Sequence, residues 1–166
     1  MLSLDLHIHS QYSLDSVNRV TTIIKMAEYR RLNVIAITDH NTMKGYIEIK
    51  KNRCLATRVE KANICVIPGI EISSIGCDLL CLFIENEPVL KPNLNPDEVI
   101  DRVRSDNDAS IILAHAGRGD VHRSLIEKVD LVEVFNARSK PSDNLKAEML
   151  RAKYHKQPIC NSDAHF

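Results

Sequence analysis

The sequence Leu4-Asp5-Leu6-His7-Ile8-His9, residues 4–9, alternates apolar with polar side chains and ends in a pair of histidines. A period of two is typical of a β-strand, because successive side chains of a strand point to opposite faces. The pattern therefore predicts that Asp5, His7 and His9 share one face. The α-carbons of the two histidines then lie about 6.6 Å apart, so both imidazoles are able to bind one metal ion at roughly 2.0–2.1 Å.

Short apolar runs rich in Ile and Val recur along the chain, as expected for strands covered on both faces. Helical patterns separate most of them, and this alternation is typical of a parallel α/β sheet or barrel. The strands are expected at residues 2–8, 34–38, 64–72, 79–84, 110–114, 131–135 and, more weakly, 158–160. The helices are expected at residues 20–31, 42–62, 96–105, 122–128 and 142–155, with Asn41 or Thr42 as N-cap of the second and Asn95 of the third.

One connection breaks this alternation. Only residues 73–76 separate Ile72 from Cys77, which is too few for a helical crossover, so a hairpin is predicted. Pairing of Ile72 with Cys77 would place Glu71 opposite Asp78. Farther along, residues 85–95 contain two prolines and are expected to form a loop.

The bulk properties fit a soluble globular protein. The 166 residues carry no net charge, so the basic excess of many nucleic-acid-binding proteins is absent. The length suits one domain over residues 1–166. Five cysteines without a C-x-x-C pair indicate a reducing compartment. No signal peptide or membrane-length apolar run is visible, so a cytoplasmic location is expected.

Metal-competent side chains recur at the ends of the expected strands. This edge is where parallel α/β folds build their active sites. Chance would also scatter such residues over helices, as His122 and His155 illustrate. The residues in question are His7 and His9, Asp39 and His40, Glu71, His115, and Asp163 and His165.

Five motifs together resemble the PHP family (polymerase and histidinol phosphatase), in the family's order and over nearly the whole chain. This resemblance implies a distorted (β/α)7 barrel with a di- or trinuclear metal centre at the strand C-termini, and it implies hydrolysis of phosphoesters. The motifs are Asp5-Leu6-His7-Ile8-His9-Ser10, Thr38-Asp39-His40-Asn41-Thr42, Gly69-Ile70-Glu71-Ile72, Ala114-His115 and Ser162-Asp163-Ala164-His165.

The resemblance also implies how the metal ligands are shared. Glu71 would bridge the first ion and a second ion bound by His115. The first ion would be held by His7, His9, Glu71 and Asp163, and the third by Asp15, His40 and His165. Two or three divalent ions are therefore expected as cofactors, with manganese, iron and zinc as the candidates.

Two positions depart from the family pattern. Asp78 stands about where the family often carries a His on the strand after Glu71, and a carboxylate there would favour manganese or iron over zinc. Ala116 follows His115 closely, where Pro is common, and affects the loop rather than a ligand.

The expected chemistry assigns roles to four further groups. Two cations about 3.5–4 Å apart clamp a phosphoryl group, and a bound water with its pKa lowered toward ~7 supplies the nucleophile. Arg118 and Arg138 are candidates to grip phosphate oxygens, with an ordinary surface role as the alternative. His40 or His165 is the candidate proton donor to the leaving group.

Neighbouring polar residues are assigned supporting roles. Asp39 and Asp5 are expected to orient ligands. Glu133 is expected to face the barrel interior in a structural role, and Asn136, like Arg118 and Arg138, is left open between a place in the site and an ordinary surface role.

The favoured function is a phosphoesterase acting on a small phosphorylated metabolite or nucleotide, without a membrane partner and with no prediction of oligomeric state. The alternatives are a nuclease or proofreading module for nucleic acid ends and a non-catalytic metal-binding domain. An amidohydrolase-type barrel would need about 250 residues. Because the chain stops just after His165, we also expect a barrel incomplete at the C-terminus, with an exposed apolar edge.

Overall fold

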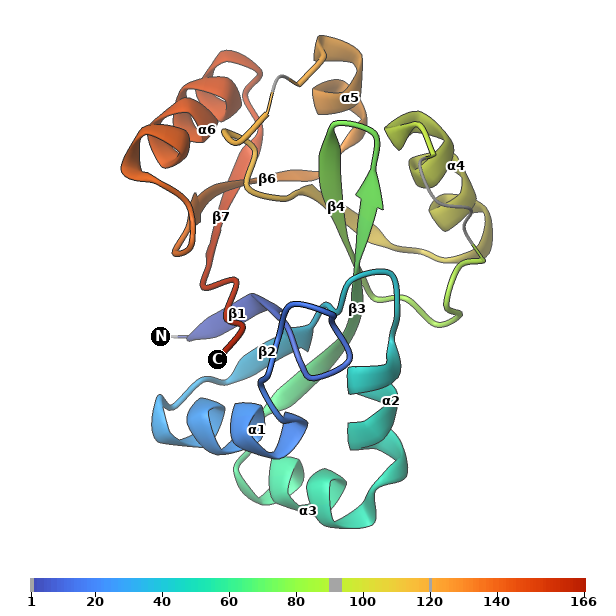
Figure 1. Ribbon diagram of the computed structural model, residues 1–166, viewed down its shortest axis with the longest axis vertical. Coiled ribbons are helices and arrows are strands. Elements are labelled where there is room, and N and C mark those ends of the chain that lie inside the picture. Colours follow the sequence, from blue (N-terminus) through green and yellow to red (C-terminus); the bar gives the residue numbers. More distant parts are fainter. Residues whose placement is uncertain (1, 90–93, 120) are drawn as a thin grey trace.

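The computed structural model describes residues 2–89, 94–119 and 121–166, so positions 90–93 of the predicted loop lie outside it. These residues form seven strands and six helices, which alternate along the chain except at the neighbours α2–α3 and β3–β4 (Figure 1). The strands are β1 (Leu4–Ile8), β2 (Val34–Ile37), β3 (Cys65–Ser74), β4 (Cys77–Leu82), β5 (Ser110–Leu113), β6 (Leu131–Asn136) and β7 (Gln157–Asn161). The helices are α1 (Val20–Tyr29), α2 (Lys44–Lys51), α3 (Arg53–Lys61), α4 (Pro96–Asp106), α5 (Arg123–Lys128) and α6 (Pro141–Lys153).

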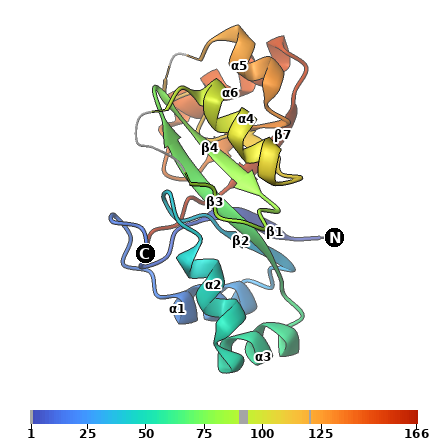
Figure 2. The same ribbon diagram turned by 90° about the vertical axis from the view of Figure 1, so that its right-hand side faces the viewer.

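The strands form one sheet in the chain order β1-β2-β3-β4-β5-β6-β7. All neighbouring pairs are parallel except β3–β4 and β4–β5, because the hairpin reverses the direction of β4. The sheet curls into a nearly closed barrel, with α1–α3 covering one half and α4–α6 the other (Figures 1 and 2). This confirms the predicted α/β barrel.

The barrel has one incompletely sealed seam, between β1 and β7. Just past the C-terminal ends of the two strands, the Asp163 N–H donates to the carbonyl of His7 and the His9 N–H donates to that of Ala164, both at 2.9 Å. Nearer the start of β1, the Leu6 N–H donates to the side-chain oxygen of Asn161 at 2.9 Å. Phe166, which follows His165 at this seam, is 91% exposed.

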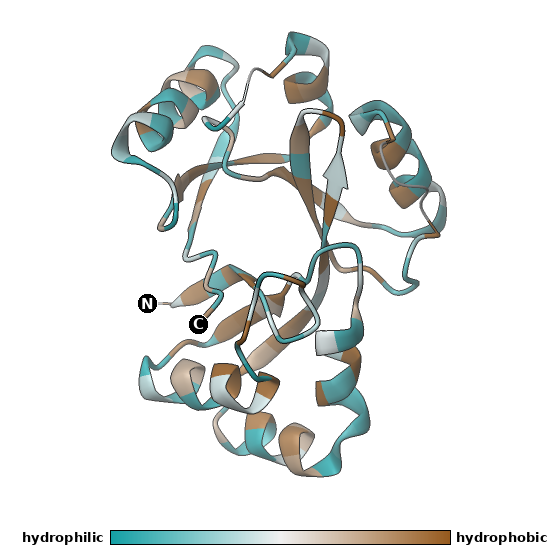
Figure 3. Cartoon of the chain, in the orientation of Figure 1, coloured by the Kyte–Doolittle hydropathy of each residue, from teal (hydrophilic) through white to brown (hydrophobic). Residues whose placement is uncertain are grey.

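Apolar side chains fill both the barrel and the layer beneath the helices. Small and branched residues such as Ala36, Leu80 and Ile112 form the interior cluster. Two larger clusters lie between the sheet and the two groups of helices. Figure 3 shows the matching pattern, with hydrophobic helix surfaces toward the strands and hydrophilic surfaces outward. Burial of these apolar side chains stabilises the packing of the helices on the sheet, and this packing fixes the positions of the strand ends.

The predicted strict alternation of β1 is wrong beyond Asp5. Leu6 packs in the interior cluster, whereas Ile8 packs against the helices. The reason is a bulge, since three residues of β1 match two of β2 between the pairs Asp5–Ile35 and Ile8–Ile37. The bulge leaves both His7 and His9 buried toward the inside of the barrel.

The hairpin is confirmed, but its predicted register is wrong by two residues. Ser74 pairs with Cys77, Ser73 with Asp78, and Glu71 with Leu80. The turn is tighter than expected because Gly76 adopts a φ of +81°, a conformation that glycine accepts without strain. A slip of two residues preserves the face, so Asp78 still points to the same side as Glu71.

The helix predicted over residues 42–62 is two helices. Asn52 has an extended backbone, and its side-chain oxygen accepts the N–H groups of Cys54 and Leu55, which caps α3. The proposed N-cap of α2 at Asn41 or Thr42 is also wrong, because Met43 occupies that position without a side-chain cap. The other predicted elements are confirmed to within two residues at each end, and Asn95 caps α4.

Candidate metal centre

The candidate metal-binding side chains lie at one rim of the barrel, which we term the upper rim. It consists of the C-terminal ends of the parallel strands together with the first residues of β4, which runs the opposite way. This reversal explains how Asp78, the second residue of its strand, reaches the same edge as residues that follow the other strands.

His7 and His9 point their Nε2 atoms toward one another, 3.1 Å apart. The Nδ1 atom of His7 lies 2.9 Å from Oε1 of Glu133, a buried carboxylate on β6. Because a carboxylate accepts hydrogen bonds, the Nδ1 of His7 carries the proton in this contact. Once the ring has lost its second proton, its Nε2 presents a lone pair toward His9.

Ser13 sets the orientation of His9 in the same manner. Its hydroxyl donates to Asp39 at 2.9 Å, which uses the only hydrogen that it has. Ser13 Oγ is therefore an acceptor for the Nδ1–H of His9 at 3.0 Å and for the backbone N–H of His40 at 3.0 Å. The expected orienting role of Asp39 thus passes through a serine that the sequence analysis missed.

Two carboxylates complete a central group, defined as His7, His9, Glu71 and Asp163. Oε2 of Glu71 lies 3.3 Å and 2.9 Å from Nε2 of His7 and His9, and Oδ1 of Asp163 lies 3.4 Å from both. All four side chains are buried. Four donor atoms that converge on one small space are the arrangement that binds a divalent cation.

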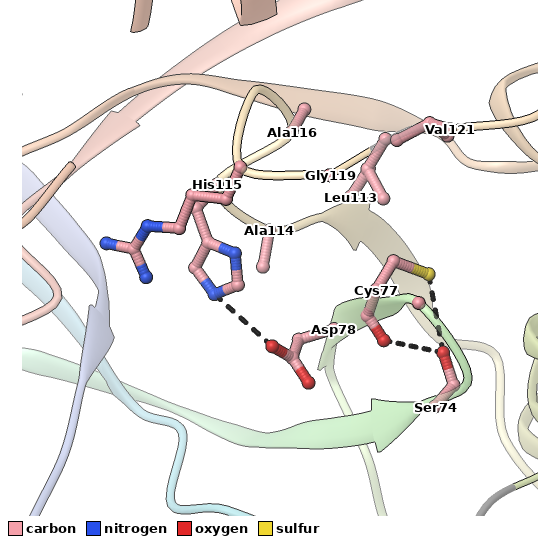
Figure 4. Close-up of a pocket in the computed structure, with 11 residues that line it drawn as sticks. Ser74, Cys77, Asp78, Leu113, Ala114, His115, Ala116, Gly119 and Val121 are labelled. Atoms are coloured by element: carbon pink, nitrogen blue, oxygen red, sulfur yellow. Dashed lines mark hydrogen bonds and ion pairs between the residues drawn. The ribbon is translucent and has the colours of Figure 1, made fainter. Parts of the chain in front are cut away.

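The group extends in one direction to what we term the Asp78 end, comprising Asp78 and His115. Nε2 of His115 lies 3.1 Å from Oε1 of Glu71. The same atom lies 3.6 Å from Oδ2 of Asp78 (Figure 4). Glu71 therefore presents one oxygen to the central group and the other to this end.

In the other direction lies the His165 end, comprising Asp15, His40 and His165. Oδ2 of Asp15 lies 3.0 Å from Nε2 of His165, and Oδ1 lies 3.5 Å from Nε2 of His40. Among the described residues, three overlapping sets of donor atoms each fall within 4.8 Å of one another, and they share His9 and Glu71. The sets are His9–His40–His165, His7–His9–Glu71 and Glu71–Asp78–His115.

The donor set suits a cation rather than a hydrogen-bond network. Oε2 of Glu71 and Nδ1 of His40 lie 3.1 Å apart and are both buried, yet neither atom makes a hydrogen bond of ordinary geometry. Buried polar atoms without partners are costly. Divalent ions between these atoms would satisfy them together with the paired Nε2 lone pairs of His7 and His9.

The pKa values reflect how tightly these charges are coupled. Burial alone would raise the pKa of Glu71, but the charge of His7 and bonds from three histidines hold it well below its usual value. Burial likewise opposes the low pKa of Glu133, which contact with His7 brings to about 2. Both carboxylates are therefore ionised at neutral pH.

The histidines and the outer carboxylates shift in different directions. Burial lowers the pKa of His9. In His7 burial acts the same way, but Glu71 and Glu133 outweigh it and raise the pKa well above the usual value. Burial and the charge of Glu71 raise the pKa of Asp78, whereas His165 and His40 outweigh burial and lower that of Asp15.

Arg118 and Arg138 both lie at the rim, half exposed. A guanidinium nitrogen of Arg118 donates to Asn136 at 2.9 Å and to Asp163 at 3.3 Å, and one of Arg138 lies 2.8 Å from the ring nitrogens of His165. Of the two roles left open for Asn136, the ordinary surface role is wrong. Asn136 is fully buried and donates to both Glu133 and Asp163, because a bulge in β6 turns both Glu133 and Asn136 inward.

The backbone is strained at two of these positions. His115, two residues past the end of β5, has a backbone φ of 29°, and Asp163 has a φ of 55°. Non-glycine residues seldom adopt such angles, and each costs on the order of 1–3 kcal/mol. The rest of the fold holds these two side chains toward the centre despite that cost.

All nine residues predicted as ligands therefore lie in one connected cluster, whereas His122 and His155 are exposed and outside it. Glu133, Asn136 and Ser13 are the functional candidates that the sequence analysis underrated or missed. A carboxylate in the middle of an apolar strand was the available signal for Glu133. The spacing of Ser10 and Ser13 after the H-x-H pair was the signal for Ser13.

The model of the PHP domain matches residues 5–164 of the chain. The chain belongs to the PHP domain family. A relative, the uncharacterized protein MJ1587 of Methanocaldococcus jannaschii, is 33% identical over 149 residues, which cover 80% of this chain and 81% of the relative.

Solved structures share the PHP barrel at low identity. An inferred metal-dependent phosphoesterase of Bifidobacterium adolescentis superposes with a TM-score of 0.77 at 16% identity, covering 99% of this chain and 88% of the other. A two-domain protein of Bacteroides vulgatus containing a predicted PHP-like metal-dependent phosphoesterase gives 0.76 at 17%, covering 99% and 52%. An amidohydrolase of Chromobacterium violaceum, solved with sulfate and no metal, gives 0.74 at 17%, covering 98% and 87%. These likenesses support the fold.

Among the described residues, no helix has the length and apolar character needed to cross a membrane.

Proposed function

We propose that this protein hydrolyses a phosphomonoester at a centre of two or three divalent metal ions. The observation that carries the proposal is the convergence of the Nε2 atoms of His7 and His9 on oxygens of Glu71 and Asp163, with both Nδ1 atoms engaged elsewhere. Neutral imidazoles and ionised carboxylates in this arrangement are the ligands of hydrolytic metal centres.

The three overlapping donor sets indicate how the ions would be held. The central group would hold one ion, the Asp78 end with Glu71 a second, and the His165 end a third. Carboxylate oxygens of Asp78 and Glu71 in the second set favour manganese or iron over zinc. When bound, such ions neutralise a phosphoryl group and lower the pKa of a bound water toward ~7.

The side chains of the chain prepare this reaction. Glu133 and Ser13 hold the two imidazoles of the central group in one tautomer. Arg118 and Arg138 stand at opposite sides of Asp163, and their free N–H groups would grip the phosphate oxygens that do not react. Water oxygen attacks phosphorus, the bond from phosphorus to the ester oxygen breaks, and the alcohol leaves with one proton.

Protonation of the leaving oxygen is assigned to His40 rather than His165. The side chain of His40 is 31% exposed and faces Asp15, whereas that of His165 is 1% exposed. A general acid must reach the substrate within hydrogen-bond distance. His165 is then left to metal binding, and His40 serves as the donor when its Nε2 is free of metal.

The proposal is tested with an aryl phosphomonoester and the corresponding diester. The protein is stripped of metal and reloaded with manganese, iron or zinc, beside a His9→Ala variant and a His155→Ala control, whose exposed histidine lies outside the cluster. We expect metal-dependent turnover that His9→Ala loses and His155→Ala keeps. Turnover that is independent of metal, or retained by His9→Ala, would contradict the proposal.

The same experiment separates the proposed function from a nuclease. A preference for the monoester of tenfold or more supports the phosphatase. The zero net charge of the chain and the presence of only two arginines in the described contacts of the cluster favour this outcome over a nucleic acid groove. A preference for the diester would instead favour nuclease-type chemistry.

A further inference from the structure

A small pocket of about 340 Å³ opens directly beside the Asp78 end of the metal centre. Asp78 and His115 form one wall, and the tip of the β3–β4 hairpin and the segment after β5 form the others (Figure 4). The pocket is therefore within reach of the organic group of a phosphoester whose ester oxygen lies over Glu71, which both His40 and His115 contact.

Beyond that wall, the described residues that line this pocket are mostly small and, apart from Arg118, uncharged. Ala114, Ala116 and Gly119 bring the main chain close, and Val121 adds an apolar surface. Among the described residues that line it, Arg118 supplies the single cationic side chain, and there is no Phe, Tyr or Trp; the one ring is the imidazole of His115, whose Nε2 faces Glu71 and Asp78. These described residues thus offer a nucleobase no large aromatic surface for stacking and an anion no second cation.

Two polar groups mark its outer end. The hydroxyl of Ser74 donates to the carbonyl of Cys77 at 2.6 Å and lies 3.3 Å from the Cys77 sulfur. Burial raises the pKa of the Cys77 thiol, which is therefore neutral at physiological pH. A hydroxylated ligand would find weak, uncharged partners here rather than ions.

We propose that this pocket binds the alcohol portion of the substrate, and that the substrate is an aliphatic, hydroxylated phosphomonoester of about three to five carbons. This inference rests on the proposed function and names its substrate class. The volume lies at the lower limit of ligand pockets, roughly 300–1,000 Å³. A nucleoside would exceed the compact part of the pocket and gain no large aromatic stacking partner among the residues described.

Cys77 limits the length of the pocket. A second cavity of about 380 Å³, lined by Asn95 and Ser124, lies on its other side, and the two cavities share Gly76, Cys77 and Val121. Enlarging Cys77 would shorten the pocket, and reducing it would join the two cavities. Cys77 is thus the position that sets the size of the accepted alcohol.

The experiment compares kcat/KM for methyl phosphate, glycerol 1-phosphate, ribose 5-phosphate and adenosine 5′-monophosphate. Wild-type protein should prefer glycerol 1-phosphate or ribose 5-phosphate to the nucleotide by at least tenfold. Cys77→Phe should reduce the ratio of polyol phosphate to methyl phosphate at least tenfold, and Cys77→Ala should improve the nucleotide relative to the polyols. Cys54→Phe, at an exposed cysteine on α3, should leave every ratio unchanged.

A binding measurement separates this inference from the proposed function. Backbone amide shifts of Ser74, Gly76 and Cys77 are followed while ribose 5-phosphate is added to manganese-free, magnesium-loaded protein. Shifts at these amides without turnover on any ester would support the pocket and contradict the hydrolase. Turnover with equal kcat/KM across the series, unaffected by Cys77→Phe, would overturn the pocket and leave the hydrolase standing. Neither turnover nor shifts would overturn both.

Discussion

The middle of the metal centre and its two ends differ in how their side chains are held. His7, His9, Glu71 and Asp163 are almost completely buried, and each imidazole is fixed by a hydrogen bond from its far nitrogen. At the ends, the side chains of Asp15, His40 and Asp78 are 49%, 31% and 29% exposed, whereas those of His115 and His165 are only 11% and 1% exposed. We infer that the middle sets metal affinity, while the ends admit substrate and exchange more easily.

Glu71 provides the largest expected effect, because it belongs to both the middle and the Asp78 end. Glu71→Gln keeps the shape of the side chain but removes the charge shared between the donor sets. Loss of a bridging carboxylate should cost several kcal/mol of transition-state stabilisation, which is about a thousandfold in kcat/KM. Steady-state kinetics on an aryl phosphate check this, with Glu60→Gln on the exposed face of α3 as the matched control. A loss below tenfold would break the distinction between middle and ends.

Glu133 comes next, since it acts on the middle without belonging to it. Glu133→Gln retains an acceptor for His7 but removes its charge, and we expect a loss of roughly 10–100-fold in metal affinity. Calorimetric titration with manganese measures it. Binding equal to that of wild type would show that the bond from Glu133 to His7 is structural alone.

The same residue predicts a pH dependence of the metal-free protein. The folded pKa of Glu133, about 2, is below its ordinary value of 4.5. Its contribution to stability is therefore present above pH 4.5 and is lost as the pH falls through the folded value. Acid unfolding followed by circular dichroism should lose steepness between about pH 4.5 and 2 in Glu133→Gln. An unchanged profile would argue against the ionised, bonded state of this carboxylate.

His7 predicts that metal binding becomes tighter as the pH rises. Its pKa is raised well above 6.5, so an ion must displace a proton from it. Apparent manganese affinity should rise as the pH increases above 6.5, with release of a proton on binding that is visible in buffers of different ionisation enthalpy. Affinity that does not change from pH 6.5 upward would contradict the account of the middle.

Asp78 should give the smallest change in activity and the clearest change in metal preference. Asp78→His replaces a hard oxygen donor by imidazole at the exposed end of the centre, which favours zinc. We expect kcat/KM with manganese to fall only a few-fold, on the order of 1 kcal/mol, while the ratio of zinc to manganese activity rises. An effect as large as that of Glu71→Gln would place Asp78 with the middle instead.

The sequence predicted the positions of the candidate ligands better than the residues that orient them. His7 and His115 stand at the ends of their strands, and Glu71 lies in β3 beside His40, which follows β2, so position along the chain fixes position at the rim. Glu133 and Asn136 were underrated because a bulge in β6 turns both inward, and a pattern of period two does not predict an inserted residue.

Local turns account for the remaining errors. The register of Asp78 depended on a tight turn at Gly76, and the break between α2 and α3 depended on the side chain of Asn52 capping the second helix. Helical periodicity continues across such a break, so it did not distinguish one helix from two. Ser13 lies in a loop, where its contacts with Asp39 and His9 arise only from tertiary packing.

The number of ions bound per chain tests the central claim most directly. Wild-type protein and Glu71→Gln would be reconstituted with manganese, freed of excess metal and analysed by mass spectrometry for metal and protein. The shared donor sets predict two to three ions per wild-type chain and no more than one in Glu71→Gln. Equal metal content in the two proteins, or less than one ion in the wild type, would contradict a centre built around Glu71.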